Sequence, residues 1–219
     1  MTEELEHCIL PPDRITEAAT LAAAAFDNSP IYNVICGPNC EPEFRQSFLQ
    51  WLFEHNFRQR IGTDVNRCVL DSNGKLVAFF MFVSPDTPDV SLWDMLRAGM
   101  LKGIFKFGFG VVKRLVTIKD EYEHIEDIVL KKNEYKPIYR LERMVVHPNH
   151  QGKGMGSIAL KHALKDADDK DLQVMLSTQE ERNVRFYERL GFKVVHTSIL
   201  AEHTNWVMIR NRKSMTGST

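Results

Sequence analysis

Residues 141–157 read Leu-Glu-Arg-Met-Val-Val-His-Pro-Asn-His-Gln-Gly-Lys-Gly-Met-Gly-Ser. The stretch begins as an apolar run, breaks at a proline and opens a helix at Ser157. Free backbone N–H groups and the helix dipole converge on an anion in such a turn, and Lys153 adds a positive charge. Three glycines let the backbone approach that anion with no Cβ in the way: Gly152, Gly154 and Gly156. The stretch therefore predicts a strand, an anion-binding loop and a helix N-terminus.

The whole string resembles motif A of the GNAT N-acetyltransferase superfamily, in which Val-x-Pro precedes Gln/Arg-x-x-Gly-x-Gly/Ala. Here the pattern is Val146-His147-Pro148, followed by Gln151-Gly-Lys-Gly-Met-Gly156. The resemblance implies that the loop grips the pyrophosphate of acetyl-CoA. Judged from its residues alone, the same loop could also be one that merely turns the chain. The flanking histidines, His147 and His150, are expected to shape the loop rather than to catalyse.

A second stretch, Asn183-Val-Arg-Phe-Tyr187-Glu-Arg-Leu-Gly191-Phe192, resembles motif B of the same superfamily. Asn183 and Tyr187 are four residues apart and share one face of a helix. The resemblance places that face against the pantetheine arm and the thioester. The alternative is that Tyr187 is a half-buried aromatic residue whose hydroxyl is satisfied elsewhere.

The chemistry of acetyl transfer needs few groups. The amine must lose a proton because a free ammonium has a pKa near 10, the carbonyl oxygen needs a fixed donor as it gains charge, and the departing thiolate needs a proton. The resemblance implies a bulged fourth strand that splays from the fifth and aims the N–H of Val145 or Val146 at the thioester oxygen. Tyr187 is the candidate acid.

Glu142 is the candidate base, because it lies four residues before Val146, where similar aminoglycoside N-acetyltransferases carry a glutamate facing the acceptor. Strand alternation places Arg140, Glu142 and Met144 on one face if no bulge intervenes. The alternative is a structural ion pair of Glu142 with Arg140 or Arg143. No metal is expected. Contacts with acetyl-CoA, the cosubstrate, are expected from Met144, Val145, Val146, Gln151, Gly152, Lys153, Gly154, Met155, Gly156, Ser157, Asn183 and Tyr187.

The composition is that of an ordinary globular protein. The 219 residues are 43% hydrophobic and 26% charged, with a net charge of −1, so no basic field suggests nucleic acid as the main partner. The N-terminus lacks the anatomy of a signal peptide, and no apolar run reaches transmembrane length. A cytoplasmic protein is expected. The four cysteines show no metal spacing and are expected to be free thiols, with a disulfide left open: Cys8, Cys36, Cys40 and Cys68.

Hydrophobic periodicity and turn signals divide most of the chain into helices and strands. Strands are expected at 6–10, 67–70, 76–83, 138–146, 173–176, 192–195 and 206–210. Helices are expected at 15–26, 42–60, 154–168 and 180–190. Asn73-Gly74 between two strands signals a hairpin. The expected fold is α/β (α+β): a mixed, mostly antiparallel sheet of about seven strands, with helices on both faces.

Residues 84–136 form an insertion before the fourth strand, with a helix expected from Ser91. Between Arg97 and Lys119 there are six basic residues and no acidic one, interleaved with apolar residues. Three interpretations stay open: a lid packed over the sheet, a mobile cover over the acceptor or CoA site, and a membrane-surface segment. Residues 120–132 are expected to be a solvated helix.

Residues 1–210 are expected to be one domain, and 211–219 a disordered tail. The helix exit at 24–30, the insertion and residues 183–192 look like the puromycin N-acetyltransferase-like branch, which implies a small-molecule amine acceptor. That branch often shows Leu-Glu-Thr where this chain has Leu176-Ser177-Thr178, which puts puromycin-like acceptors in doubt. The prediction is direct acetyl transfer to a primary amine by a monomer or homodimer. The alternatives are a protein or peptide N-acetyltransferase and a non-catalytic acyl-CoA-binding or membrane-associated module.

Overall fold

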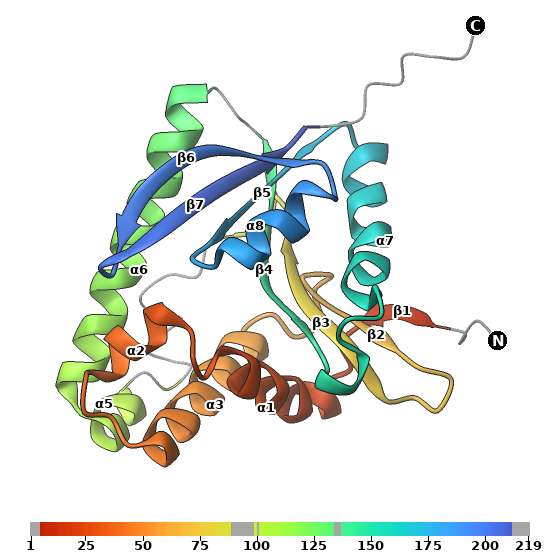
Figure 1. The fold of residues 1–219 in the computed structure, drawn as a ribbon. Coiled ribbons are helices and arrows are strands. Elements are labelled where there is room, and N and C mark those ends of the chain that lie inside the picture. The colour runs from red at the N-terminus through yellow and green to blue at the C-terminus, as the bar shows by residue number, and fades with distance from the viewer. Residues whose placement is uncertain (1–4, 89–98, 100, 134–136, 212–219) are drawn as a thin grey trace, which may run out of the picture.

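A computed structural model describes residues 5–88, 99, 101–133 and 137–211. Its centre is a seven-stranded sheet in the order β1-β2-β3-β4-β5-β7-β6 (Figure 1). Neighbouring strands are antiparallel except β4 and β5, which are parallel. The strands are β1 Glu6–Ile9, β2 Asn66–Leu70, β3 Leu76–Val83, β4 Ile138–Val146, β5 Gln173–Thr178, β6 Phe192–Leu200 and β7 His203–Arg210. The predicted mixed, mostly antiparallel sheet is confirmed.

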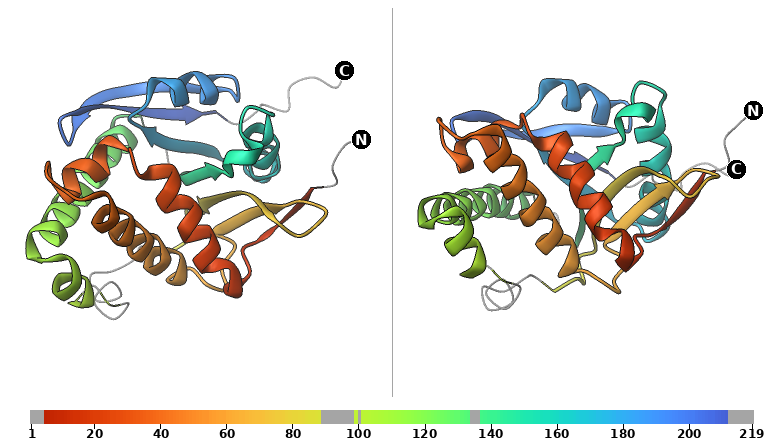
Figure 2. Two further views of the ribbon diagram at one scale, coloured as in Figure 1. Left: turned by 60° about the horizontal axis from the view of Figure 1, so that its bottom comes forward. Right: turned by 90° about the horizontal axis from the view of Figure 1, so that it is seen from below.

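The helices cover both faces of the sheet (Figures 1 and 2). One face carries α1 Ile15–Phe26, α2 Pro30–Cys36, α3 Pro42–Arg58, α5 Leu101–Phe107 and α6 Phe109–Asn133. The other face carries α7 Met155–Asp169 and α8 Glu181–Glu188. Two short 3-10 turns, η1 Pro12–Arg14 and η3 Pro148–His150, precede α1 and α7. Each face has its own core of buried apolar side chains, so the sheet is covered on both sides.

The central strand β3 shows why this sheet is buried. All eight of its residues, Leu-Val-Ala-Phe-Phe-Met-Phe-Val, are buried. Their side chains alternate between the two cores, with Phe79 in the core that includes α1 and α3 and Phe80 in the core that includes α7 and α8. A continuous apolar run is typical of a strand covered on both faces. This prediction from the sequence is confirmed.

Several boundaries differ from those predicted. The helix exit after Phe26 is confirmed, but α2 starts at once with Pro30 in its first turn, a position that suits proline. The strands β6 and β7 are longer than expected, because they pair all the way to Leu200 and His203. The helix expected from Ser91 and the tail at 212–219 lie outside the described residues, and the single-domain organisation stays a prediction.

In the described part of the insertion, the chain forms the helices α5 and α6, which pack against the rest of the domain. The chain turns at Gly108, whose φ of +86° separates α5 from α6. On α6, Arg114 donates through Nε to the Ile35 carbonyl at 2.7 Å and through Nη2 to the Cys36 carbonyl at 3.1 Å. These bonds tie α6 to the end of α2. Of the three interpretations, they support a packed lid, although Phe105 and Phe109 are exposed.

The second half of α6 is only partly the solvated helix that the charged sequence indicated. Ile125 and Val129 are buried in the core beneath α1 and α3, and Tyr122 packs against it. Glu126, one residue after Ile125, is only 6% exposed. The helix expected over residues 120–132 is confirmed and its charged face is exposed, but the expectation missed the opposite face, which apolar residues at helical spacing bury.

Candidate active site

The strands β4 and β5 separate beyond their first three residues. They pair only where Ile138–Arg140 face Gln173–Met175, although β4 continues to Val146 and β5 to Thr178. Beyond that point the two parallel strands no longer form a ladder with each other. The result is the splay between the fourth and fifth strands that the resemblance implied.

A β-bulge in β4 lies beside the splay. Glu142 is opposite Met81 and Val145 is opposite Phe79, so two residues of β4, Arg143 and Met144, face one residue of β3. Arg143 has a φ of +53°. Such a bulge re-aims side chains.

The bulge changes which residues share a face. Arg140 and Glu142 both line the cavity below the splay, as alternation predicted, and the bulge adds Arg143 to them. Met144 packs toward the core under α7 and α8, although it also contributes to the cavity wall. The common face with Glu142 was expected only without a bulge, and the extra residue in β4 removes that condition.

The backbone of β4 offers one N–H group to the splay. The N–H of His147 donates to the Val77 carbonyl on β3 at 2.8 Å. Since backbone groups alternate along a strand, the N–H of Val145 also points toward β3, whereas that of Val146 points to the other side, toward β5. Of the two predicted donors, Val146 is the one that faces the splay.

The glycine loop follows β4 directly. Gln151 folds back and donates through Nε2 to the Val146 carbonyl at 3.0 Å, and Lys153 donates through Nζ to the Asn149 carbonyl at 2.9 Å. The His147 ring accepts from the Asn149 N–H at 3.3 Å, so this histidine shapes the loop as expected. The loop is thus held by its own side chains.

Two of the glycines take a left-handed backbone and leave open space around them. Gly152 and Gly154 have φ of +73° and +79°, and no atom lies within 4 Å of where a Cβ would be. Gly156 is different, because a Cβ there would lie 3.1 Å from Cζ of Phe186 on α8. Among the described residues, no backbone carbonyl accepts from the N–H of Gly152, Lys153 or Gly154. The loop and the first turn of α7, which includes Met155, Gly156 and Ser157, therefore fit an anionic group such as a pyrophosphate.

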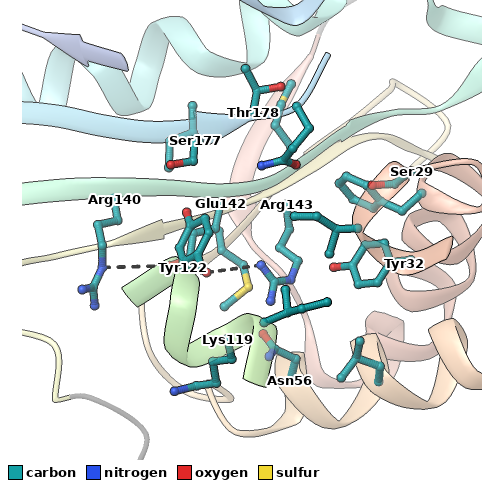
Figure 3. Close-up of a pocket in the computed structure, with 18 of the residues that line it drawn as sticks. Ser29, Tyr32, Asn56, Lys119, Tyr122, Arg140, Glu142, Arg143, Ser177 and Thr178 are labelled. Carbon is teal, nitrogen blue, oxygen red and sulfur yellow. Dashed lines mark hydrogen bonds and ion pairs between the residues drawn. The ribbon is translucent and has the colours of Figure 1, made fainter. Parts of the chain in front are cut away.

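A cavity of about 350 Å³ lies below the splay (Figure 3). Its walls come from α1, α2, α3 and α6 on the helical side and from β4, β5 and α8 on the other. Tyr32, Tyr122, Glu142 and Arg143 are among its lining residues. The loop residues 151–157 do not line it. The structure therefore separates the glycine loop from a partly open pocket, with the splay between them.

Asn183 and Tyr187 lie on the wall of this cavity. Asn183 donates through Nδ2 to Thr178 Oγ1, at the end of β5, at 3.3 Å. Tyr187 is 9% exposed, with its ring against Phe186 and Phe192. Burial raises the pKa of the Tyr187 phenol, so it stays protonated at neutral pH. A protonated hydroxyl beside the splay is able to donate a hydrogen bond to a leaving group.

Glu142 lies between two arginines. Its carboxylate is 3.9 Å from Arg140 Nε and 3.5 Å from Arg143 Nη1 (Figure 3). The ion pairs that formed the alternative interpretation are thus present. The side chain of Glu142 is nevertheless 24% exposed and lines the cavity, so it is also placed to meet a bound molecule.

Sequence reasoning missed several cavity residues, among them Tyr122 and Glu126 on α6. Burial raises the pKa of the Glu126 carboxyl to about 7; the Glu142 carboxylate acts in the same direction, while the Tyr122 hydroxyl and Arg140 act against both. A signal was present in the sequence, because Ile118, Tyr122, Ile125 and Val129 recur at helical spacing. It marks a buried face that the surrounding charges obscured.

These features define a class of protein: an α/β domain whose parallel central strands splay beside a glycine loop at a helix N-terminus, which is the GNAT fold. Residues 113–194 match the family described as an acetyltransferase (GNAT) domain. Residues 113–194 therefore carry the sequence pattern of a GNAT-superfamily acetyltransferase domain.

Solved structures with the same fold cover almost the whole chain. One is described as histone acetyltransferase HPA2 and related acetyltransferase from Corynebacterium glutamicum, with a TM-score of 0.66, 17% identity and coverage of 97% of this chain and 99% of that one. Another is the polyamine N-acetyltransferase of Drosophila melanogaster, with a TM-score of 0.62, 12% identity and coverage of 95% and 100%. Identities this low establish the fold alone.

Proteins with higher sequence identity match only a short segment of the chain. A tRNA(Met) cytidine acetyltransferase, TmcA, from Thermococcus sp. (strain AM4) is 37% identical over 81 residues, which is 34% of this chain and 10% of that protein. The Pyrococcus abyssi TmcA is 40% identical over 62 residues, which is 27% of this chain and 8% of that protein. The chain thus matches only about a tenth of the length of these relatives.

Among the described residues, no helix has the length and apolar character needed to cross a bilayer. No group of three or more His, Cys, Asp or Glu side chains among them is arranged to hold a metal ion.

Proposed function

We propose that this chain is an acetyl-CoA-dependent N-acetyltransferase that moves an acetyl group directly to a primary amine of a small molecule. The observation that carries the proposal is the splay between β4 and β5, with the glycine loop on one side and the cavity on the other. A long donor with a pyrophosphate at one end and a thioester at the other suits this arrangement. A cytoplasmic location is part of the proposal.

Each step of the transfer has a candidate group. The loop from Gln151 to Ser157 holds the pyrophosphate, with the glycines providing close approach. The Val146 N–H, which points into the splay, donates to the carbonyl oxygen as it gains negative charge. Tyr187 donates to the leaving sulfur, and Glu142 faces the acceptor ammonium with its carboxylate. Acetyl-CoA supplies the acyl group.

The volume of the cavity supports a small acceptor. A volume of about 350 Å³ walled by α1, α2, α3 and α6 is within the range of small-molecule sites. The similar proteins named above act by their names on different acceptors, including polyamines and tRNA, so the choice rests on the cavity. Placement in the puromycin N-acetyltransferase-like branch remains a prediction.

Calorimetry of acetyl-CoA binding and an assay of thiol release test the function together. Wild-type protein is expected to bind acetyl-CoA and to release thiol only when an amine is present, with small primary amines preferred over peptides in a panel. Binding without thiol release on any amine would support the non-catalytic acyl-CoA-binding alternative. Absence of binding would contradict the proposal.

The loop makes a matched pair of variants possible. Gly152 and Gly74, which lies in the β2–β3 turn, have φ of +73° and +72°, both with open space at the Cβ position. Alanine at either site adds the same left-handed backbone strain, roughly 1–2 kcal/mol. Gly152→Ala is expected to weaken acetyl-CoA binding by about tenfold or more, measured by calorimetry, because it also places a methyl group where the phosphate should approach.

Gly74→Ala is the control, and it should lose similar stability while binding acetyl-CoA like the wild type. Equal affinities for the two variants would show that the loop around Gly152 does not contact the donor.

A further inference from the structure

We propose that Glu126, on the insertion helix α6, accepts the proton that the acceptor ammonium must lose before it attacks the thioester. This inference rests on the proposed function and adds to it a catalytic residue from the insertion. It concerns the acceptor side of the cavity, opposite the loop that holds the donor.

The position of Glu126 is the first reason. The residue is 6% exposed and lines the cavity, and Glu142 lines the same cavity from β4. Packing of α6 does not require a carboxyl group there, because Ile118, Ile125 and Val129 already supply buried apolar contacts. Burying a carboxyl group beside a ligand-sized cavity lowers the stability of the fold, which favours a functional role for this residue.

The charged surroundings of Glu126 are the second reason. Tyr122 and Glu123 approach it from α6 itself, and Arg140 and Glu142 approach it from β4. The net effect is a pKa of about 7, with burial as the largest cause. A pKa of about 7 lies about 3 units below that of an ordinary ammonium group, whereas the pKa of an ordinary glutamate, about 4.5, lies about 6 units below it. Glu126 is therefore a better proton acceptor at neutral pH than a carboxylate in water.

Glu142 has a different part in this arrangement. Its carboxylate is engaged by Arg140 and Arg143 at 3.9 and 3.5 Å, so its charge is already compensated. It is suited to orient the ammonium by accepting a hydrogen bond, while Glu126 takes the proton. The base and the orienting group are thus separate carboxylates on separate elements.

The protons and electron pairs balance with these groups. An N–H bond of the ammonium breaks and an O–H bond forms on Glu126. The nitrogen lone pair forms the C–N bond, the C–S bond breaks, and the sulfur takes the proton of the Tyr187 hydroxyl. The nitrogen then gives a second proton to the Tyr187 oxygen, which restores the phenol, and Glu126 releases its proton to water. The sum is one proton released for each acetyl group transferred.

The test is the pH dependence of kcat/KM for Glu126→Gln against wild type, using the best amine from the panel. The kcat/KM of the wild type is expected to rise with pH, with a midpoint near pH 7, and then to stay level up to the pKa of the amine. Without Glu126, only amine that is already neutral reacts, so the variant should be about 10²-fold slower at pH 7.5 and should keep rising toward pH 10. Glu126→Asp should recover part of the rate.

Asp127→Asn is the matched control, because Asp127 is the next residue on α6 and its side chain is 62% exposed. It should leave both the rate and the profile unchanged. If Glu126→Gln lowers kcat/KM by the same factor at every pH, Glu126 only supports the structure and the inference is wrong.

A direct titration separates this inference from the proposed function. In protein with ¹³C-labelled glutamate carboxyl groups, the signal absent from Glu126→Gln should titrate near pH 7, whether or not any amine is acetylated. A midpoint between about 4 and 5, the range of an ordinary glutamate, would overturn the inference even if wild type is a good acetyltransferase. Failure of wild type to bind acetyl-CoA would overturn the proposed function, and the inference with it.

Discussion

Replacing Tyr187 by phenylalanine is expected to lower kcat of the proposed acetyl transfer by about 10²-fold. The phenol lines the cavity beside the splay, and burial raises its pKa, so it remains protonated and able to donate to the departing sulfur. A leaving thiol with a pKa of roughly 8.5 needs that donor most below this pH. The loss should therefore be largest near pH 7 and should narrow above about pH 9, as measured by thiol release at saturating amine.

The affinity for acetyl-CoA should stay close to wild type in Tyr187→Phe, because the ring and its packing against Phe186 and Phe192 are retained. Tyr139→Phe is a suitable control. Tyr139 is fully buried on β4 and accepts a hydrogen bond from Lys170 at 2.7 Å, outside the cavity. The kcat of Tyr139→Phe should equal that of the wild type. An unchanged kcat in Tyr187→Phe would remove Tyr187 from the mechanism.

The second large effect is on stability. Arg210, at the end of β7, donates through Nη1 and Nη2 to both carboxylate oxygens of Asp168 on α7, at 2.8 and 2.7 Å. Its Nε donates to the Leu190 carbonyl at 3.2 Å. The arginine side chain is only 6% exposed. One residue therefore joins the sheet, α7 and the turn after α8.

Arg210→Met is expected to lower the free energy of unfolding by about 3–5 kcal/mol, because the largely buried carboxylate of Asp168 loses its guanidinium. Urea unfolding followed by circular dichroism measures the change. An exposed pair on the same helix, Lys165 and Asp169, provides the control, and Lys165→Met should unfold at nearly the wild-type urea concentration. Equal midpoints for the two variants would contradict the role given to Arg210.

Local sequence determined most of the sheet and the glycine loop. The apolar run of β3, the Asn-Gly turn before it and the strand–loop–helix around Gly152 each depend on residues close together in the chain, and the structure confirms them. The pairing of Asn183 with Tyr187 on one helical face likewise follows from a spacing of four residues. For such features, backbone sterics and helical or strand periodicity are sufficient.

The tertiary structure decided the acceptor side of the site. The bulge at Arg143 determines which β4 side chains face the cavity, and it depends on the register with β3. The environment of Glu126 depends on α6 packing against the sheet, where Glu142 and Arg140 come from β4. The sequence has no carboxylate at position 177, but the fold brings Tyr122 beside both Ser177 and Glu126. Burial and charge at these residues arise from segments distant in sequence, so no local pattern could supply them.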